Sequence, residues 1–112
     1  MSTDLRVRVA TAADDAAVAT LITDAYQGTG VMFMERPEDV AARRQQGLVI
    51  VIEQRGRLVA TCTLTPRQAA RRTMSLSRFA VHPTVQRQGI GDDVLRELRA
   101  LLVSRGITDA GG

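Results

Sequence analysis

Residues able to hold an anion are concentrated in one short segment, Gln86-Arg87-Gln88-Gly89-Ile90-Gly91. The segment follows an apolar stretch that ends at His82-Pro83, and it precedes a stretch with helical periodicity. The first backbone N–H groups of a helix have no partner within the helix, and the helix dipole makes them attractive to anions. Glycines just before such a helix let a bulky anion approach closely, and Arg87 adds a positive charge. This pattern predicts a loop that binds a diphosphate.

Two well-known phosphate-binding motifs do not fit this loop. A P-loop requires Lys followed by Ser or Thr after its last glycine, whereas Asp92-Asp93 follow Gly91. A dinucleotide-binding fingerprint requires Gly or Ala at the position where Val94 stands. The alternative to a phosphate site is an ordinary turn between a strand and a helix. In that case the negative charges of Asp92 and Asp93 would only stabilise the start of the helix through its dipole.

The elements that position this loop follow from hydrophobic periodicity. Strands are predicted where apolar residues alternate or run continuously between turn residues, at 5–9, 48–53, 58–65 and 74–81. Helices are predicted where apolar residues recur every three or four positions, at about 12–26, 37–46 and 90–105. The order β-α-α-β-β-β-α predicts an α+β fold with α/β/α layers and a mostly antiparallel sheet. Within it, we expect Thr11 and Asp14 to cap the first helix, and Leu58, Ala60, Cys62 and Leu64 to share one strand face.

Composition limits the class of protein. The chain has 112 residues, 45% of them hydrophobic, and a formal net charge of +3, so one soluble domain is expected. There is one cysteine, no signal-peptide pattern, and no apolar run longer than Leu48 to Ile52, so we predict a cytoplasmic protein with no membrane partner. A basic chain suits a polyphosphate partner, either nucleic acid or coenzyme A. With only three aromatic residues there is no stacking platform, so no nucleic acid is predicted.

In this order of elements, the segment 86–91 resembles the signature of the GNAT N-acetyltransferase family. That signature is Gln/Arg-x-x-Gly-x-Gly/Ala at the start of the helix after the fourth strand, and every defined position matches. Val81-His82-Pro83 is similar to the family's strand end, and the resemblance covers nearly all of residues 5–106. It implies an incomplete acyl-CoA N-acyltransferase fold. Residues 1–112 would form a single domain lacking the usual C-terminal strand, helix and two further strands.

The resemblance also implies an activity and a cosubstrate. Acetyl-CoA would lie with its pantetheine arm along the fourth strand and its pyrophosphate on the loop. A primary amine of a small molecule or peptide would attack the thioester directly, so the chain is expected to be an enzyme that forms no covalent acyl intermediate. The implied cofactor-binding residues are Phe79, Ala80, Val81, Gln86, Arg87, Gln88, Gly89, Ile90 and Gly91.

The catalytic residues are less well defined. The family's usual general base is a Glu on the fourth strand, where this sequence has Ser75. The Tyr that usually acts as the general acid belongs to the helix after the fifth strand, which this sequence does not include. Tyr26 and Glu35 flank the apolar segment Met32-Phe33-Met34 and are the remaining proton-transfer candidates, although each is also an ordinary surface or capping residue. The second hypothesis is therefore an acetyl-CoA-binding module or remnant without turnover.

The remaining reactive residue types are expected to have structural roles. His82 ends a strand beside a proline, and Cys62 lies among core positions of an alternating strand. One His and one Cys cannot form a structural zinc site, so no metal is predicted. The basic loop with Arg67, Arg71 and Arg72 is expected to be solvated, with contact to the 3′-phosphate of coenzyme A or to an acidic acceptor as the alternative. A sheet ending at its fourth strand would leave an open edge. We expect either that another chain, such as a second copy in a homodimer, covers this edge or that the protein is marginally stable.

Overall fold

The computed structural model describes residues 5–27, 30, 34–66, 73–86, 91–106 and 109–111. Its five strands form one sheet in the order β1-β2-β3-β4-β5. The strands are β1 (Leu5–Val9), β2 (Leu48–Gln54), β3 (Arg57–Pro66), β4 (Thr73–Val81) and β5 (Asp109–Gly111). The helical elements are a 3-10 turn η1 (Ala12–Asp14), α1 (Asp15–Gln27), α2 (Pro37–Gln46), α3 (Pro83–Gln86) and α4 (Gly91–Ser104). The predicted α+β fold class with a mostly antiparallel sheet is confirmed.

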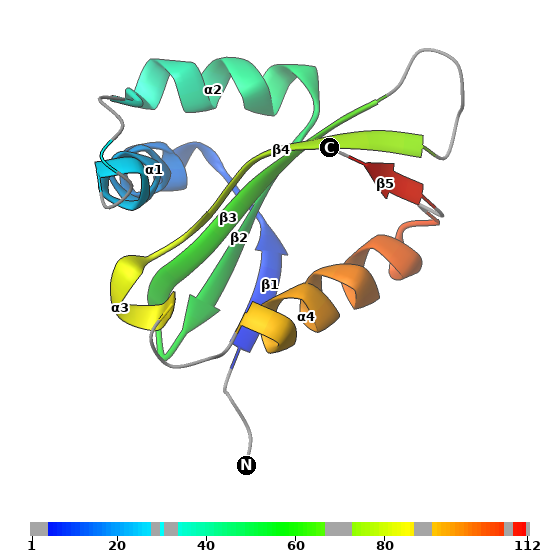
Figure 1. The fold of residues 1–112 in the computed structure, drawn as a ribbon. Helices are drawn as coiled ribbons and strands as arrows, with labels where there is room; N and C mark the ends of the chain where they lie inside the picture. Colours follow the sequence, from blue (N-terminus) through cyan, green and yellow to red (C-terminus); the bar gives the residue numbers. More distant parts are fainter. Residues whose placement is uncertain are drawn as a thin grey trace.

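The sheet separates two hydrophobic cores (Figure 1). Helices α1 and α2 cover one face, and α4 covers the other (Figure 1). The continuous apolar run of β2 serves both faces, because alternate side chains of a strand point in opposite directions. Val49 and Val51 belong to the α1/α2 core, and Ile50 and Ile52 belong to the α4 core. The prediction that this strand is buried on both sides is confirmed.

Helix α4 is held against the sheet by an apolar stripe. Val94, Leu98 and Leu102 recur at every fourth position, and all three are buried in the core on that face. Burial of each such side chain contributes about 1.5–3 kcal/mol relative to exposure. The helix ends at Ser104, and Gly106 just beyond it has a φ of 75°, a left-handed conformation that favours glycine. The stripe therefore fixes which face of α4 packs on the sheet.

A cap and two ion pairs fix the position of the turn η1 and of the start of α1, which follows it directly. The Thr11 N–H donates to an Asp14 carboxylate oxygen at 2.8 Å, which confirms the predicted cap. Arg8 on β1 donates to the same carboxylate at 2.8 and 2.9 Å and also pairs with Glu53 of β2. These contacts join the start of α1 to the edge of the sheet.

Two local expectations are corrected. The register between β2 and β3 shifts at Ile52/Glu53, so that Val59 joins the α4 core. Leu58 packs on the α1/α2 side, not with Ala60, because the bulge reverses which way the strand's side chains point. In addition, α3 forms a single helical turn that was not predicted from the sequence.

The expected end of the sheet is also corrected. The sheet does not stop at the fourth strand, because β5 pairs with β4 in parallel, joining Thr73 to Asp109 and Ser75 to Gly111. The expectation of a second copy of the chain rested on a completely open β4 edge. Because β5 covers the first part of that edge, a second copy of the chain would have only the remainder of β4 to cover.

Candidate functional site

The most unusual feature of the sheet is the outer edge of β4. Its register with β5 covers only Thr73, Met74 and Ser75. On the opposite side, β4 pairs with β3 as far as Val81. Within the described part of the chain, no strand pairs with the outer edge of β4 beyond Ser75. Figure 1 shows the short β5 beside only the first part of β4. An edge of this kind can bind an extended chain by backbone hydrogen bonds.

A β-bulge lies in the middle of this open edge. Thr63 pairs with Ser77 and Thr61 pairs with Ala80, so Cys62 faces two residues of β4, Arg78 and Phe79. Arg78 has a φ of 51°, a left-handed conformation that is uncommon outside glycine. Bulges of this kind bend a strand and are enriched next to active sites. Nothing in the local sequence indicated it, because no glycine marks the position.

The open edge leads directly to the predicted anion-binding loop. His82 donates its backbone N–H to the Val59 carbonyl at 2.8 Å, which holds the end of β4 to the neighbouring strand. Helix α3 follows, and Gly91 begins α4. The start of a long helix therefore comes ten residues after the end of β4, with α3 between them, and a helix start is where an anion can bind.

The predicted cofactor-binding residues divide into two groups. Phe79 is 36% exposed, Ala80 is buried, and Val81 is half-buried, all on the open half of β4. Gln86 ends α3 and Gly91 begins α4. Arg87, Gln88, Gly89 and Ile90 lie outside the described residues, so their contact with a diphosphate stays a prediction. Arg67, Arg71 and Arg72 lie outside the described residues as well.

A buried ion pair lies on the α1/α2 side of the sheet. Glu35, just before α2, has a side chain only 2% exposed, and it pairs with Arg43. The Nε of Arg43 donates to the Thr63 hydroxyl at 3.0 Å, and the backbone N–H of Glu35 donates to the Thr23 hydroxyl at 3.0 Å. These contacts hold the Glu35 carboxylate and the Arg43 guanidinium directly over the centre of β3.

The electrostatics of this cluster connect it to the β4 bulge. Burial lowers the pKa of Arg43, and the like charge of Arg78 lowers this pKa further. Tyr26, in the last turn of α1, acts on the same pKa in the opposite direction. The two proton-transfer candidates named from the sequence, Tyr26 and Glu35, are thus both close to Arg43. Arg43 was not predicted, although its spacing of three residues from buried Val40 indicated that it shares the inward face of α2.

Ser75 occupies the point where three strands meet. Its backbone pairs with Thr65 of β3 and with Gly111 of β5. The open part of the β4 edge therefore begins immediately after the position at which the family resemblance places a glutamate base. A serine hydroxyl there can donate or accept a hydrogen bond, but it is a poor general base.

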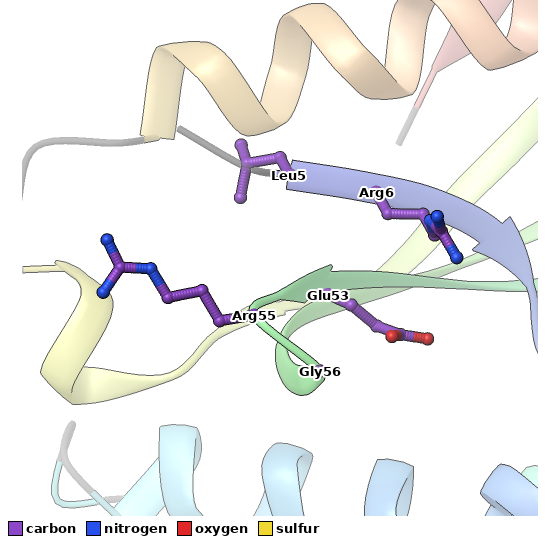
Figure 2. Close-up of a pocket in the computed structure, with 5 residues that line it drawn as sticks. All are labelled: Leu5, Arg6, Glu53, Arg55 and Gly56. Atoms are coloured by element: carbon purple, nitrogen blue, oxygen red, sulfur yellow. The ribbon is translucent and has the colours of Figure 1, made fainter. Parts of the chain in front are cut away.

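A hollow lies at the β2–β3 turn. It has a volume of about 610 Å³ and is lined by Leu5, Arg6, Glu53, Arg55 and Gly56. Figure 2 shows the side chains of Arg55 and Glu53 pointing in opposite directions. Glu53 is paired with Arg8, so this hollow holds no carboxylate poised for proton transfer.

Cys62 has the buried surroundings expected of it. Cys62 is fully buried, and burial raises the pKa of its thiol to about 12, so it is protonated and inert at neutral pH. Among the described residues, no three His, Cys, Asp or Glu side chains are grouped so as to hold a metal ion. In the same part of the chain, no helix combines the length and apolar character needed to cross a bilayer.

The sequence matches the model of the acetyltransferase (GNAT) family over residues 16–110, and the chain belongs to that family. No curated protein matches it significantly. Ribosomal-protein-S18-alanine N-acetyltransferase from Escherichia coli superposes with a TM-score of 0.71 at 22% identity, covering 92% of this chain and 62% of that one. A GNAT family acetyltransferase from Brucella melitensis, in complex with acetyl-CoA, superposes with a TM-score of 0.74 at 23% identity, covering 97% of this chain and 75% of that one.

N-acetylglutamate synthase from Neisseria gonorrhoeae, complexed with coenzyme A and N-acetyl-glutamate, superposes with a TM-score of 0.71 at 21% identity, covering 97% of this chain and 24% of that one. At these identities the likeness shows the fold alone. The present chain spans 62% of the length of the Escherichia coli enzyme.

Proposed function

We propose that this chain binds acetyl-CoA along the open edge of β4 and transfers the acetyl group to a primary amine. The observation that carries the proposal is that no described strand pairs with the outer edge of β4 beyond Ser75, where β4 leads into the glycine-containing loop before α4. Membership of the acetyltransferase (GNAT) family supports the same activity.

The chain's own groups fit the proposed cosubstrate. The pantetheine arm carries two amides, and we place it along Phe79 to Val81, as an extended chain is added to the edge of a sheet. The loop 86–91 would place helix N–H groups and Arg87 beside the pyrophosphate. When bound, acetyl-CoA supplies the activated thioester. The role of β4 is to hold that thioester at a fixed position relative to the bulge.

The acceptor amine must lose a proton during the transfer. Tyr26 and Glu35 are the candidates, and both lie near Arg43. The Glu35 carboxylate already accepts a hydrogen bond from Arg43, which favours its ionised form but also makes it a weaker base. We therefore assign Glu35 to holding Arg43 in place, and we propose that the Tyr26 hydroxyl relays the amine proton to water, because an un-ionised phenol cannot itself keep the proton.

The acceptor belongs to the class of primary amines, either of a small molecule or of a peptide terminus. Two of the similar structures are named for amine acceptors of these kinds, an alanine of ribosomal protein S18 and glutamate. Both assignments concern those proteins. For this chain they support the class of acceptor.

A second candidate function is acetyl-CoA binding without turnover. Ser75 occupies the position of the usual base, and this favours the second candidate. A titration with acetyl-CoA followed by a thiol-release assay with an amine panel separates the two. Binding with release of coenzyme A in the presence of amine supports the enzyme, whereas binding alone supports the module. No stabilisation by acetyl-CoA would contradict both, because a ligand bound only to the native state must raise its stability.

A further inference from the structure

Two buried threonines of β3 lie on either side of the β4 bulge. Thr61 is 1% exposed and Thr63 is 2% exposed. Thr61 pairs with Ala80 of β4, Thr63 pairs with Ser77, and the register shifts between these two pairs. Valine is close to threonine in shape and also suits a strand, so the feature that distinguishes threonine at these positions is the hydrogen bond of its hydroxyl.

The two hydroxyls are bonded to different parts of the molecule. The Thr61 hydroxyl donates to the Ile50 carbonyl of β2 at 2.8 Å, so this contact stays within the sheet. The Thr63 hydroxyl accepts from Nε of Arg43 at 3.0 Å, so this contact joins the sheet to α2. Of the two contacts, the second therefore connects the bulge region to an element outside the sheet.

The contact of Thr63 with α2 is the last of a series that begins on α1. The Thr23 hydroxyl of α1 accepts from the Glu35 backbone N–H at 3.0 Å. The Glu35 carboxylate, which is 2% exposed, pairs with Arg43, and Arg43 reaches Thr63. The series thus links α1, the start of α2 and the centre of β3 through buried polar groups.

The free energy of folding does not explain this series well. Nη2 of Arg43 is buried and has no hydrogen-bond partner among the described residues, which costs free energy. A buried ion pair such as Glu35 with Arg43 also adds little net stability compared with well-packed apolar side chains. Buried polar groups of this kind can instead select one arrangement of the elements that they join.

The arrangement that matters here is the register of β4. Because of the bulge, Ala80 lies opposite Thr61 and joins the α1/α2 core, while Phe79 is 36% exposed. Without the extra residue, Phe79 would lie opposite Thr61, and Ala80 would turn to the other face of the sheet. The bulge thus determines which side chains of β4 face each side of the edge on which the proposed function places acetyl-CoA.

We propose that Thr63 is a positioning residue for acetyl transfer, because its contact with Arg43 holds the β4 bulge in register with the helices. Thr63 pairs with Ser77 directly beside the register shift, so tying Thr63 to α2 fixes the residue at which regular pairing stops. The proposal rests on the proposed function, since the group that is positioned is the acetyl group of acetyl-CoA on β4. Thr63 is buried, so it acts through the strand and not by touching the substrate.

The test compares three variants that change one hydroxyl each. Thr63→Val removes the hydroxyl that contacts α2, Thr63→Ser keeps it, and Thr61→Val removes the hydroxyl that is bonded within the sheet. Thermal unfolding first establishes that each variant is folded. Thr63→Val is expected to lower kcat about ten-fold or more, because small misplacements of reacting groups cost large factors in rate, while KM for acetyl-CoA changes less than about two-fold. Thr63→Ser should recover most of kcat, and Thr61→Val should keep it.

Three results of this assay would overturn the proposal. The first is a wild-type kcat in Thr63→Val, and the second is an equal loss of kcat in the two valine variants. The third is a loss in Thr63→Ser as large as that in Thr63→Val. If Thr63→Val does not fold, the double variant Glu35→Gln/Arg43→Met takes its place, because it removes the contact without leaving one charge buried and unpaired.

A binding measurement gives the same test in the absence of turnover. Acetyl-CoA and coenzyme A differ only in the acetyl group, so the ratio of their Kd values reports how well that group is held. Wild type and Thr61→Val should bind acetyl-CoA more tightly by about three-fold or more, the effect of roughly one hydrogen bond, and Thr63→Val should bring the ratio close to one. The same ratio in wild type and Thr63→Val would overturn the proposal. No binding of acetyl-CoA by wild type would instead reject the proposed function.

Discussion

Gly47 connects α2 to β2 at a place where no larger residue fits. A methyl group at this position would overlap the carbonyl oxygen of Leu64 and lie 3.1 Å from both the Leu64 carbonyl carbon and the Thr65 Cα. These atoms are backbone atoms of β3, a central strand paired on both sides, so they cannot move aside easily. The substitution Gly47→Ala must therefore push the end of α2 away from the sheet.

The expected cost can be estimated from the kind of atoms involved. Overpacking a core costs about 1–3 kcal/mol, and a backbone obstacle places this case at the upper end. Alanine recovers about 0.4–1 kcal/mol by restricting the unfolded chain. The net loss in the free energy of unfolding is thus about 2 kcal/mol. The displacement also moves Arg43, whose carbonyl accepts the Gly47 N–H at 3.0 Å and whose side chain reaches Thr63.

Urea unfolding of Gly47→Ala and of a control, Gly56→Ala, measures this cost. Gly56 has a φ of 80° and open space around it, so alanine there meets only backbone strain of about 1 kcal/mol. We expect Gly47→Ala to be clearly the less stable of the two. A Gly47→Ala protein as stable as wild type, or more stable than the control, would refute the packing argument.

Two further predictions concern titration and thiol reactivity. Hydrogen bonding from Arg8 lowers the pKa of Asp14 to about 2 from 3.8, so its stabilisation is complete above pH 4 and is lost as the pH falls towards 2. Because Arg8 is 36% exposed, solvent screening reduces the contribution of the ion pair to about 1 kcal/mol. The free energy of unfolding of Asp14→Asn should therefore be lower than that of wild type by this amount at pH 7, and equal to it near pH 2. A difference that stays constant between these pH values would contradict the prediction. Cys62 should react with a thiol reagent only as fast as the protein unfolds, whereas complete labelling of the folded protein within minutes would show that the thiol is accessible.

Hydrophobic periodicity predicted the elements whose burial is regular. The continuous run of β2 and the four-residue repeat of α4 each determine a single orientation against the sheet, and both are observed. The bulges at Val59 and Arg78 were not predictable in this way, because a register shift depends on the partner strand and not on the local pattern. Strand β5 was missed since Asp109-Ala110-Gly111 has low strand propensity and forms only by pairing with β4.

The candidate site was predictable to a similar extent. The spacing of the glycine-containing loop relative to the next helix can be read from the sequence alone, and the anion site that it predicts there stays a prediction. Glu35 lies just before the start of α2, and its partner Arg43 lies within that helix. Arg43 in turn contacts Thr63 of β3, which is 20 residues further along the chain. Such a contact appears only once α2 is packed on β3. The charge cluster beside the bulge could therefore be found only from the structure.

The central claim, that acetyl-CoA binds along β4 with its diphosphate at the start of α4, is tested most directly by calorimetric titration of three proteins. Wild type should bind acetyl-CoA. Gly91→Glu, which adds bulk and negative charge at the first residue of α4, should lose binding but remain folded. Val103→Glu adds the same side chain at a position 69% exposed in the last turn of that helix, and it should bind like wild type. Equal affinity of wild type and Gly91→Glu, or no binding by wild type, would contradict the claim.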